Sequence, residues 1–178
     1  MRVLVVSHGH PAFSIGGAEV ASHALFRGLS DAKGTEAFYL ARAAAPLRRH
    51  ADTPLASFRQ GAHETFLHAE EYDHWWLSSR ALDDLDGAFA DYLCMTRPDV
   101  VHFHHVIGLG VEAIAVVRRV LPDAAIVMTF HEYLSICAHH GQMVKTKANR
   151  LCRGASPAPG ASSPPARGQR TGTAPRAT

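Results

Sequence analysis

RVLVVSHGHPAFSIGGAE, residues 2–19, joins a short valine-rich run to a loop that ends in two glycines. Residues 2–7 are apolar nearly throughout, which is typical of a strand buried on both faces of a parallel sheet. After the glycine pair, apolar residues recur at helical spacing from Ala18 to Leu29. A buried strand, a loop and an amphipathic helix in this order predict the first unit of an α/β fold.

The alternation continues along the chain. Further strands are expected at residues 36–41, 99–104 and 124–130, and a further helix at 109–121. Ser78 and Ser79 are plausible caps for another helix, whose apolar stripe runs from Leu82 to Leu93 and which Pro98 ends. Residues 42–65 are polar and irregular and are expected to form a long loop, while 66–77 fit no single element. We predict a doubly wound, Rossmann-like α/β domain on a parallel sheet, spanning residues 1–152.

Residues 153–178 differ in composition from the rest of the chain. They contain no Val, Ile, Leu, Met or aromatic residue, so they cannot bury a core and are expected to be disordered. Charge is divided as well, because residues 1–140 carry eleven basic and sixteen acidic side chains, while the remainder carries seven basic and none acidic. These arginines are sparse and have no interleaved aromatics, so we predict no nucleic-acid binding.

The sequence favours a cytoplasmic protein. No apolar stretch approaches the roughly 20 residues that span a bilayer, and histidines and a proline interrupt the apolar start. Peripheral contact with the inner membrane face, through Arg48, Arg49 and Trp75-Trp76, is the alternative to a solvated loop with packed aromatics. Three cysteines make no disulfide framework, and Cys94 is expected to be a small core residue.

Histidines gather where the predicted strands end. The positions are His8 and His10 after the first strand, His102, His104 and His105 at residues 99–105, and His131 after the last strand. The carboxyl ends of parallel strands share one edge, which is where open α/β sheets bind ligands. We therefore predict a functional crevice at this edge, although some of these histidines are expected only to cap strand ends and His102 to point into the core.

Gly16 and Gly17 open the first predicted helix. The lack of side chains lets the backbone approach a phosphate, and the helix N-terminus favours negative charge. The pair is not a G-x-G-x-x-G dinucleotide fingerprint, so no nicotinamide or flavin cofactor is predicted. Glu19 lies in the first helical turn, where a carboxylate also complements the helix dipole.

Three segments together resemble the amino-terminal domain of the family 4 glycosyltransferases, which have the GT-B architecture. They are VLVVSHGHPAFSIGGAE, RPDVVHFHH and VMTFHEYLSIC, and the resemblance covers about residues 1–154. It implies a retaining transfer of a sugar from a nucleotide-diphosphate sugar to the hydroxyl of an unidentified acceptor. Two Rossmann-like domains face each other in such enzymes, and the amino-terminal one mainly shapes the acceptor site.

The resemblance also implies roles for individual residues. His131 matches the histidine at the domain cleft, where it would orient a sugar hydroxyl and stabilise developing oxocarbenium character. Gly16 and Gly17 match the loop that approaches the donor diphosphate, with Glu19 beside them. His104 and Glu132 match supporting groups on the acceptor side. The resemblance implies no residue of this chain as a nucleophile for the sugar transfer.

The chain departs from the family pattern in its last third. ICAHHGQMVKTKANRLC resembles a variant in which a further cysteine pair follows, yet only Cys137 and Cys152 are present here. With His139 and His140 these thiols offer a marginal metal site, and we assign no metal ligand from the sequence. The second, donor-binding domain is not recognisable either. We expect a truncated or frameshifted gene product, which sequencing of the coding DNA would test.

Three readings of function remain open at this point. The first is a glycosyltransferase of which this chain is the amino-terminal half, inactive alone. The second is a non-catalytic acceptor-binding or regulatory module that pairs with a separate donor domain. The third is a metal-dependent hydrolase built from SHGH, HFHH and FHE, although the aspartate that such enzymes generally add is missing from its expected place.

Overall fold

One mixed sheet organises the first part of the chain. The computed structural model describes residues 1–43, 53–58, 63–69, 72–74, 76–79, 85–137, 141–145 and 149–152. The six strands of the sheet lie in the order β3-β4-β2-β1-β7-β8. Their bounds are β1 (Arg2–Ser7), β2 (Glu36–Ala43), β3 (Leu55–Ser57), β4 (Glu64–His68), β7 (Val100–Phe103) and β8 (Ala125–Met128).

The predicted α/β class and the four predicted strands are confirmed, since β1, β2, β7 and β8 correspond to them. Neighbours pair in parallel from β4 through β2, β1 and β7 to β8. The expectation of a purely parallel sheet is wrong, because β3 pairs with β4 in the antiparallel sense. Only one edge strand breaks the parallel pattern, so the carboxyl ends of the other five still share an edge.

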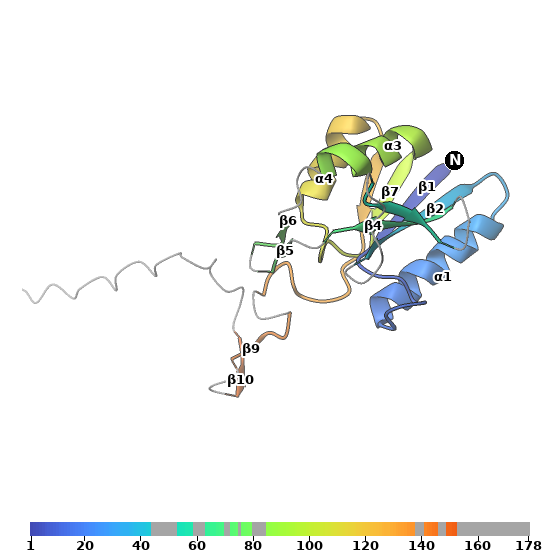
Figure 1. Cartoon of the computed structure of the whole chain (residues 1–178). Helices are drawn as coiled ribbons and strands as arrows, with labels where there is room; N and C mark the ends of the chain where they lie inside the picture. The colour runs from blue at the N-terminus through green and yellow to red at the C-terminus, as the bar shows by residue number, and fades with distance from the viewer. Residues whose placement is uncertain are drawn as a thin grey trace, which may run out of the picture. The chain divides into compact units, whose positions relative to one another are not determined.

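Helices cover the sheet from two sides (Figure 1). The helix α1 (Gly17–Asp31) places Phe26 against one face, over Val5 and Tyr39. The π-helical turn η1 (Leu85–Phe89), α3 (Ala90–Thr96) and α4 (Glu112–Val120) pack on the other face, over Leu4 and Val6. Successive residues of β1 thus serve opposite faces, and Leu4, Val5 and Val6 are completely buried. Burial on both faces explains why residues 3–6 of this strand are all apolar.

The long loop expected at residues 42–65 is wrong for the described part of that range. β2 continues to Ala43, Leu55–Ser57 form β3, and Glu64 begins β4. The strand was missed because Glu64, Thr65 and His68 interrupt its apolar pattern, although Thr65 and His68 are buried in the structure. Residues 44–52 and 59–62 lie outside the described residues.

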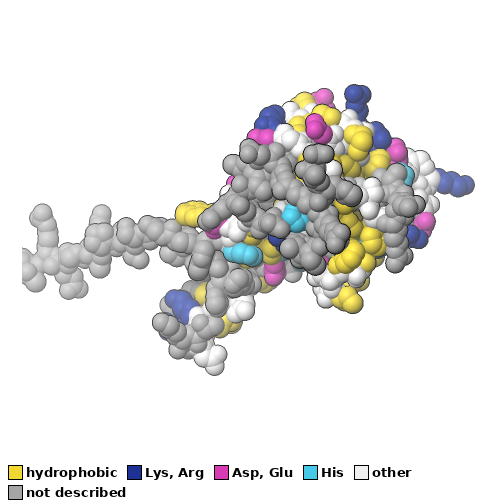
Figure 2. Space-filling view, in the orientation of Figure 1, with side chains coloured by type: hydrophobic (Ala, Val, Ile, Leu, Met, Phe, Trp, Pro, Cys, Tyr) yellow, Lys and Arg dark blue, Asp and Glu magenta, His cyan; other side chains and the backbone are white. Residues whose placement is uncertain are grey.

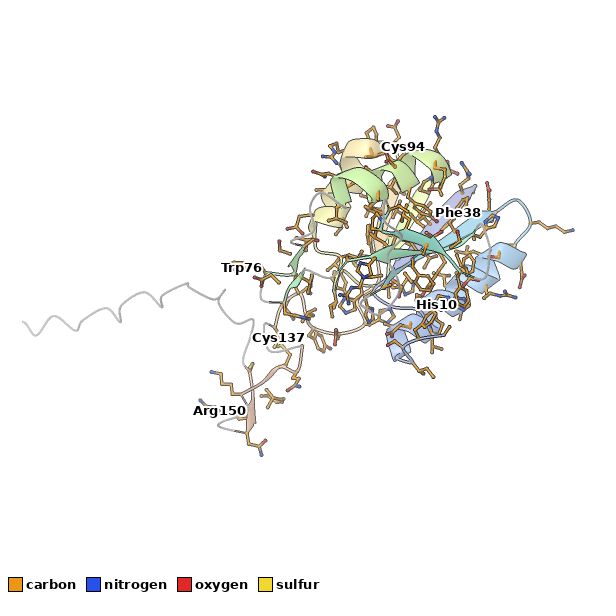
Figure 3. All side chains as sticks on the ribbon, viewed as in Figure 1. His10, Phe38, Trp76, Cys94, Cys137 and Arg150 are labelled. Atoms are coloured by element: carbon orange, nitrogen blue, oxygen red, sulfur yellow. The ribbon has the colours of Figure 1, made fainter. Side chains whose placement is uncertain are left out.

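Two smaller expectations concern the segment before and within α3. Ser78 and Ser79 form β6 (Ser78–Ser79), antiparallel to β5 (Tyr72–Asp73), and both interact with the Glu112 carboxylate of α4. Residues 80–84, where the helix that they were expected to cap would begin, lie outside the described residues. Cys94 is exposed on α3 instead of buried (Figure 3). The neighbours Tyr92 and Leu93 fill the core in its place. Leu82 lies outside the described residues.

The chain divides into two compact units, Met1–Glu132 and Tyr133–Thr178. In the second unit, β9 (Val144–Lys145) and β10 (Arg150–Leu151) form a short antiparallel pair. The tail that we expected to be disordered, residues 153–178, lies outside the described residues.

None of the described helices has the length and apolar character required to cross a bilayer. Of the residues proposed to contact a membrane, Trp76 is exposed, whereas Arg48, Arg49 and Trp75 lie outside the described residues. Among the described side chains visible in Figure 2, basic groups lie close to acidic ones.

Candidate functional site at the carboxyl edge of the sheet

The histidine groups converge on one edge of the sheet. β1, β7 and β8 are parallel neighbours, and His8, His104 and His131 follow their carboxyl ends. The His104 N–H donates to the carbonyl of Val6, and the Thr129 N–H donates to that of Phe103, so the three chain segments stay in register beyond the strands. The convergence predicted from the strand pattern is therefore observed.

His104 and His131 form a pair of imidazoles across β7 and β8. Nδ1 of His104 lies 3.0 Å from Nε2 of His131, within hydrogen-bonding distance, and the two rings stack with centroids 5.2 Å apart. His104 is buried, and burial lowers its pKa to about 4, with smaller contributions from His102 and His131. His104 is consequently uncharged at neutral pH. Its Nε2 is buried and has no hydrogen-bond partner among the described residues.

A second line of groups runs along the same edge. Nε2 of His8 lies 3.3 Å from the Glu19 carboxylate, and His105 Nε2 lies 2.8 Å from the Glu132 carboxylate. The Ile107 N–H donates to Nδ1 of His105, which leaves the proton on Nε2 and makes His105 a donor to Glu132. The His8 and His105 rings meet edge to face at 4.9 Å. Two imidazoles thus connect two carboxylates.

Burial lowers the pKa of His8 below its ordinary value, and the Glu19 carboxylate opposes that effect without cancelling it. Burial also lowers the pKa of His102. His8, His102 and His104 are consequently uncharged at neutral pH. Uncharged imidazoles can each donate and accept a hydrogen bond, which suits ligands with hydroxyl groups.

Glu19 explains the glycines of the loop. Its carboxylate is buried and accepts a hydrogen bond from Ser14 Oγ at 3.0 Å. A Cβ atom at Gly9 would lie 3.0 Å from Glu19 Oε1, and one at Gly16 would clash with Oε2. Gly16 therefore has a packing role, with an extended backbone that any residue can adopt. A Cβ at Gly17 would meet nothing within 4 Å, so the start of α1 is open to an approaching group.

A buried hydroxyl cluster supports the loop from below. The Tyr39 hydroxyl donates to the carbonyl of Gly9 at 3.2 Å and lies 2.9 Å from Ser22 Oγ. Ser22 Oγ also lies 3.2 Å from Ser7 Oγ at the end of β1. These contacts join α1, β1 and β2 beneath residues 8–16, so the loop is positioned by three elements.

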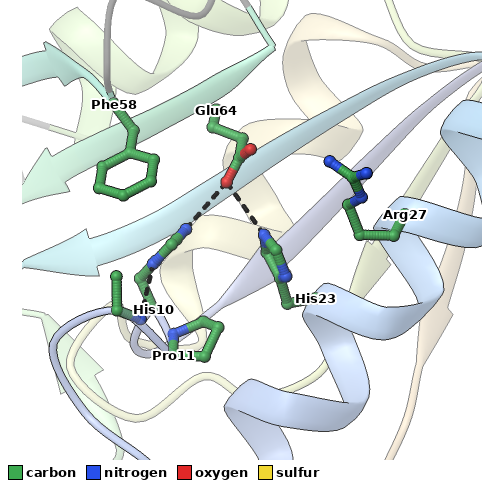
Figure 4. Close-up of a pocket in the computed structure, with 7 residues that line it drawn as sticks. His10, Pro11, His23, Arg27, Phe58 and Glu64 are labelled. Atoms are coloured by element: carbon green, nitrogen blue, oxygen red, sulfur yellow. Dashed lines mark hydrogen bonds and ion pairs between the residues drawn. The ribbon is translucent and has the colours of Figure 1, made fainter.

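Two predicted members of the edge are placed differently. His102 does not enter the core, because it is half-buried and its Nε2 lies 2.7 Å from Thr129 Oγ1. His10 turns away from the other edge histidines toward His23 and Glu64. It lines a pocket beside α1 (Figures 3 and 4). The sequence analysis missed His23 and Glu64, since one is a lone helical histidine and the other stands in the expected loop.

The cysteines add no further ligand group among the described residues. Cys137 is buried, Cys152 is half-buried and both are free thiols, while His139 and His140 lie outside the described residues. The metal-hydrolase reading required ligands from SHGH, HFHH and FHE together. Within the part of the chain that the structure describes, the only group of three convergent ligand atoms is His10, His23 and Glu64, which draws on just one of those motifs.

The arrangement favours binding of a polar, hydroxyl-bearing ligand at the edge. It offers paired imidazoles, two carboxylates and a buried imidazole nitrogen without a protein partner. No protein-family model matches this sequence, and no curated protein matches it. The resemblance to the family 4 glycosyltransferases therefore depends on the three sequence motifs quoted above and stays a prediction.

Proposed function

We propose that this chain is the acceptor-side domain of a retaining GT-B type glycosyltransferase of family 4. The observation that carries the proposal is the pairing of His104 with His131 at the carboxyl edge of a largely parallel sheet. Ligands of open α/β sheets bind at that edge. The motifs that resemble the family contribute residues to it from β1, β7 and β8.

In this role His131 is the catalytic residue, because it is exposed and can reach a bound sugar. His104 stands behind it and holds its ring through the contact between Nδ1 and Nε2. A hydrogen bond from His131 to a sugar hydroxyl would orient the transferred group and favour the oxocarbenium-like transition state. Glu132, held by His105, would accept a hydrogen bond from an acceptor hydroxyl.

Gly16 and Gly17 would face the donor diphosphate at the start of α1, where backbone N–H groups favour an anion. Glu19 is buried beneath that loop, so its part would be to position Gly16 and His8. The donor nucleotide would bind to a second domain, on another segment or another polypeptide. Closing the two domains over the sugar excludes water from the reaction.

The proposal is tested by measuring ligand binding to the purified chain. We expect weak or no binding of nucleotide-diphosphate sugars by calorimetry, and binding of a carbohydrate acceptor by saturation-transfer NMR with a glycan panel. Acceptor binding should be lost in His131→Ala and His104→Ala and retained in His74→Ala, which removes an exposed histidine from the β5–β6 turn. Tight binding of a nucleotide sugar by this chain alone would contradict the acceptor-side assignment.

The runner-up is a non-catalytic module that presents the acceptor to a separate enzyme. It is favoured by one observation, that the described residues contain one largely parallel sheet and two short antiparallel pairs. If a second polypeptide with a nucleotide-sugar site co-purifies with this chain, the enzyme and module hypotheses can be compared by assaying sugar transfer in the mixture. Transfer by the mixture that is abolished in His131→Ala supports the enzyme, whereas transfer that persists with that variant supports the module.

A further inference from the structure

Three side chains from separate elements meet beside α1. His10 comes from the loop after β1, His23 from α1 and Glu64 from β4. Nε2 of His10 lies 2.9 Å from Glu64 Oε2, and Nε2 of His23 lies 3.0 Å from the same oxygen (Figure 4). One ligand atom from each residue lies within 4.8 Å of the other two.

The group is distinct in position from the edge described above. Glu64 pairs in register with Tyr39, four residues before β2 ends at Ala43, so it lies below the carboxyl edge. His23 projects from the second turn of α1 toward the sheet, where its ring contacts that of Tyr39. The three residues therefore occupy the space between α1 and the β2–β4 part of the sheet.

We propose that His10, His23 and Glu64 bind a divalent transition-metal cation of the zinc class. Two imidazole nitrogens and one carboxylate oxygen form the donor set that Zn²⁺ takes in sites with an open coordination position. Imidazole also favours such cations over Mg²⁺ and Ca²⁺, which prefer all-oxygen sites. This inference is independent of the proposed sugar transfer.

The surroundings hold the ligands in place. His10 is almost fully buried, with 4% of its side chain exposed, and its ring contacts those of Phe58 and Phe66 at 4.5 and 5.3 Å. His23 also contacts Phe26. Aromatic walls limit the rotamers of both imidazoles, so little side-chain freedom is lost when a cation binds.

A cavity of about 350 Å³ gives the site an entrance. Its lining includes the three ligands together with Arg27 and Phe58. Arg27 lies one helical turn after His23 on α1 (Figure 4). Three protein ligands leave at least one tetrahedral position for water or a ligand oxygen, and this position would face the cavity, where Arg27 can pair with an anionic ligand.

Cation binding at Nε2 requires His10 to change its tautomer. In the metal-free protein the Ala12 N–H donates to Nδ1 of His10, so Nε2 carries the proton and donates to Glu64. A cation at Nε2 replaces this proton, and the neutral ring then carries its proton on Nδ1. Ala12 loses its acceptor in that step, but it is exposed and its N–H can turn to water. Cation binding therefore requires the Ala12 peptide to move away from Nδ1.

The three ligands would be bridged by one ion. Binding would link the loop after β1, the helix α1 and the strand β4, which are separated by as many as 54 residues in the chain. Since a cation that binds only the folded state stabilises it by mass action, Zn²⁺ should raise the melting temperature of the protein. The bound ion would hold loop residues 8–16 through His10, in addition to the contact between the Tyr39 hydroxyl and Gly9.

The test is a calorimetric titration of the full-length chain with ZnCl₂ after chelator treatment. The background is Cys137→Ser/Cys152→Ser, which removes the thiols that would compete for zinc. His23→Ala and Glu64→Gln each delete one ligand at a partly exposed position, and His74→Ala is the matched control. Co²⁺ substituted for Zn²⁺ reports the donor atoms by its visible absorption spectrum.

We expect one Zn²⁺ per chain with a dissociation constant below about 10 µM. The affinity should fall at least about 100-fold in His23→Ala and in Glu64→Gln, more than the loss of an outer-shell partner usually causes, and stay unchanged in His74→Ala. The Co²⁺ spectrum should show nitrogen and oxygen ligands without a thiolate band. Absence of binding in the cysteine-free background, or affinities unchanged in both ligand variants, would overturn the site.

Discussion

His104 and His131 lie 27 residues apart in the sequence, yet Nδ1 of the first is 3.0 Å from Nε2 of the second. The contact crosses from the end of β7 to the end of β8, which are parallel neighbours. It joins a buried imidazole to an exposed one. A ligand that contacts His131 is therefore coupled to His104, whose pKa is lowered by burial in the protein interior.

The first prediction concerns the pH dependence of stability. Burial lowers the pKa of His104 to about 4 in the folded protein, against 6.5 as its ordinary value. Between these two pH values the unfolded chain binds a proton that the folded chain does not, so stability falls as the pH decreases from 6.5 to 4. The loss attributable to this residue is about 3 kcal/mol at most.

Urea unfolding of wild type and His104→Asn across pH 4 to 7.5 would measure this effect. Asparagine keeps a polar group near the position of Nδ1 but does not titrate, so the variant should lose less stability toward acid than wild type does. His8 and His102 also have lowered pKa values, and part of the slope should remain. Identical pH slopes in the two proteins would contradict the assignment to His104.

The second prediction compares two neighbouring glycines. Gly16→Ala places a methyl group against the buried Glu19 carboxylate, whereas Gly17→Ala places one in open space. The first should cost about 1–3 kcal/mol, as overpacking usually does. The second should be neutral or stabilise by up to about 1 kcal/mol, because alanine restricts the unfolded chain and favours the helix.

A double-mutant cycle identifies the cause. In a Glu19→Ala background the carboxylate is gone, so Gly16→Ala should cost much less than it does in wild type. Thermal or urea unfolding of the four proteins provides the comparison. An equal cost in both backgrounds would show that Gly16 is required for some reason other than the space taken by Glu19.

The histidines at the carboxyl edge and the group beside α1 show how much of the structure could be predicted from the sequence. The strand, loop and helix of residues 2–31 are contiguous, so period and composition indicated them correctly. The convergence of His8, His104 and His131 followed as well, because a parallel sheet brings strand ends together. Neither inference needed the register of any strand.

The group of His10, His23 and Glu64 shows what a single sequence does not contain. Its contacts depend on β4 pairing beside β2 in one register, and polar residues hid that strand. A residue at the end of a strand can be assigned to an edge, whereas a residue within a strand needs its pairing partner to be placed. The prediction that Cys94 is buried was wrong for a related reason. An apolar stripe predicts a helix, but it does not fix the rotation of that helix about its axis to within one residue.

The third prediction follows from the placement of the cysteines. Cys94 is exposed on α3, Cys152 is half-buried and Cys137 is buried. Labelling of the native protein with a thiol reagent should therefore begin at Cys94, with Cys137 slowest. Cys94→Ser should remove the fastest phase and change the free energy of unfolding by no more than about 0.5 kcal/mol, as is usual for a surface substitution. Mass spectrometry of partly labelled protein would identify the sites, and Cys137 reacting first would be inconsistent with its burial.

The fourth prediction addresses the support beneath the loop. The Tyr39 hydroxyl is buried, donates to the Gly9 carbonyl and lies 2.9 Å from Ser22 Oγ. Tyr39→Phe keeps the ring and removes only these contacts, so it should cost about 1–3 kcal/mol, the usual effect of leaving a buried polar partner unsatisfied.

Ser22→Ala in the same background separates the two contacts. If the hydroxyls act as a unit, the double variant should be less destabilised than the sum of the single variants. Because the Gly9 carbonyl precedes His10 and follows His8, loosening it should also speed amide hydrogen exchange in residues 8–16 while β7 stays protected. Exchange that rises equally in the loop and in β7 would instead indicate a general loss of stability, and the hydroxyl would then have no specific part in holding the edge.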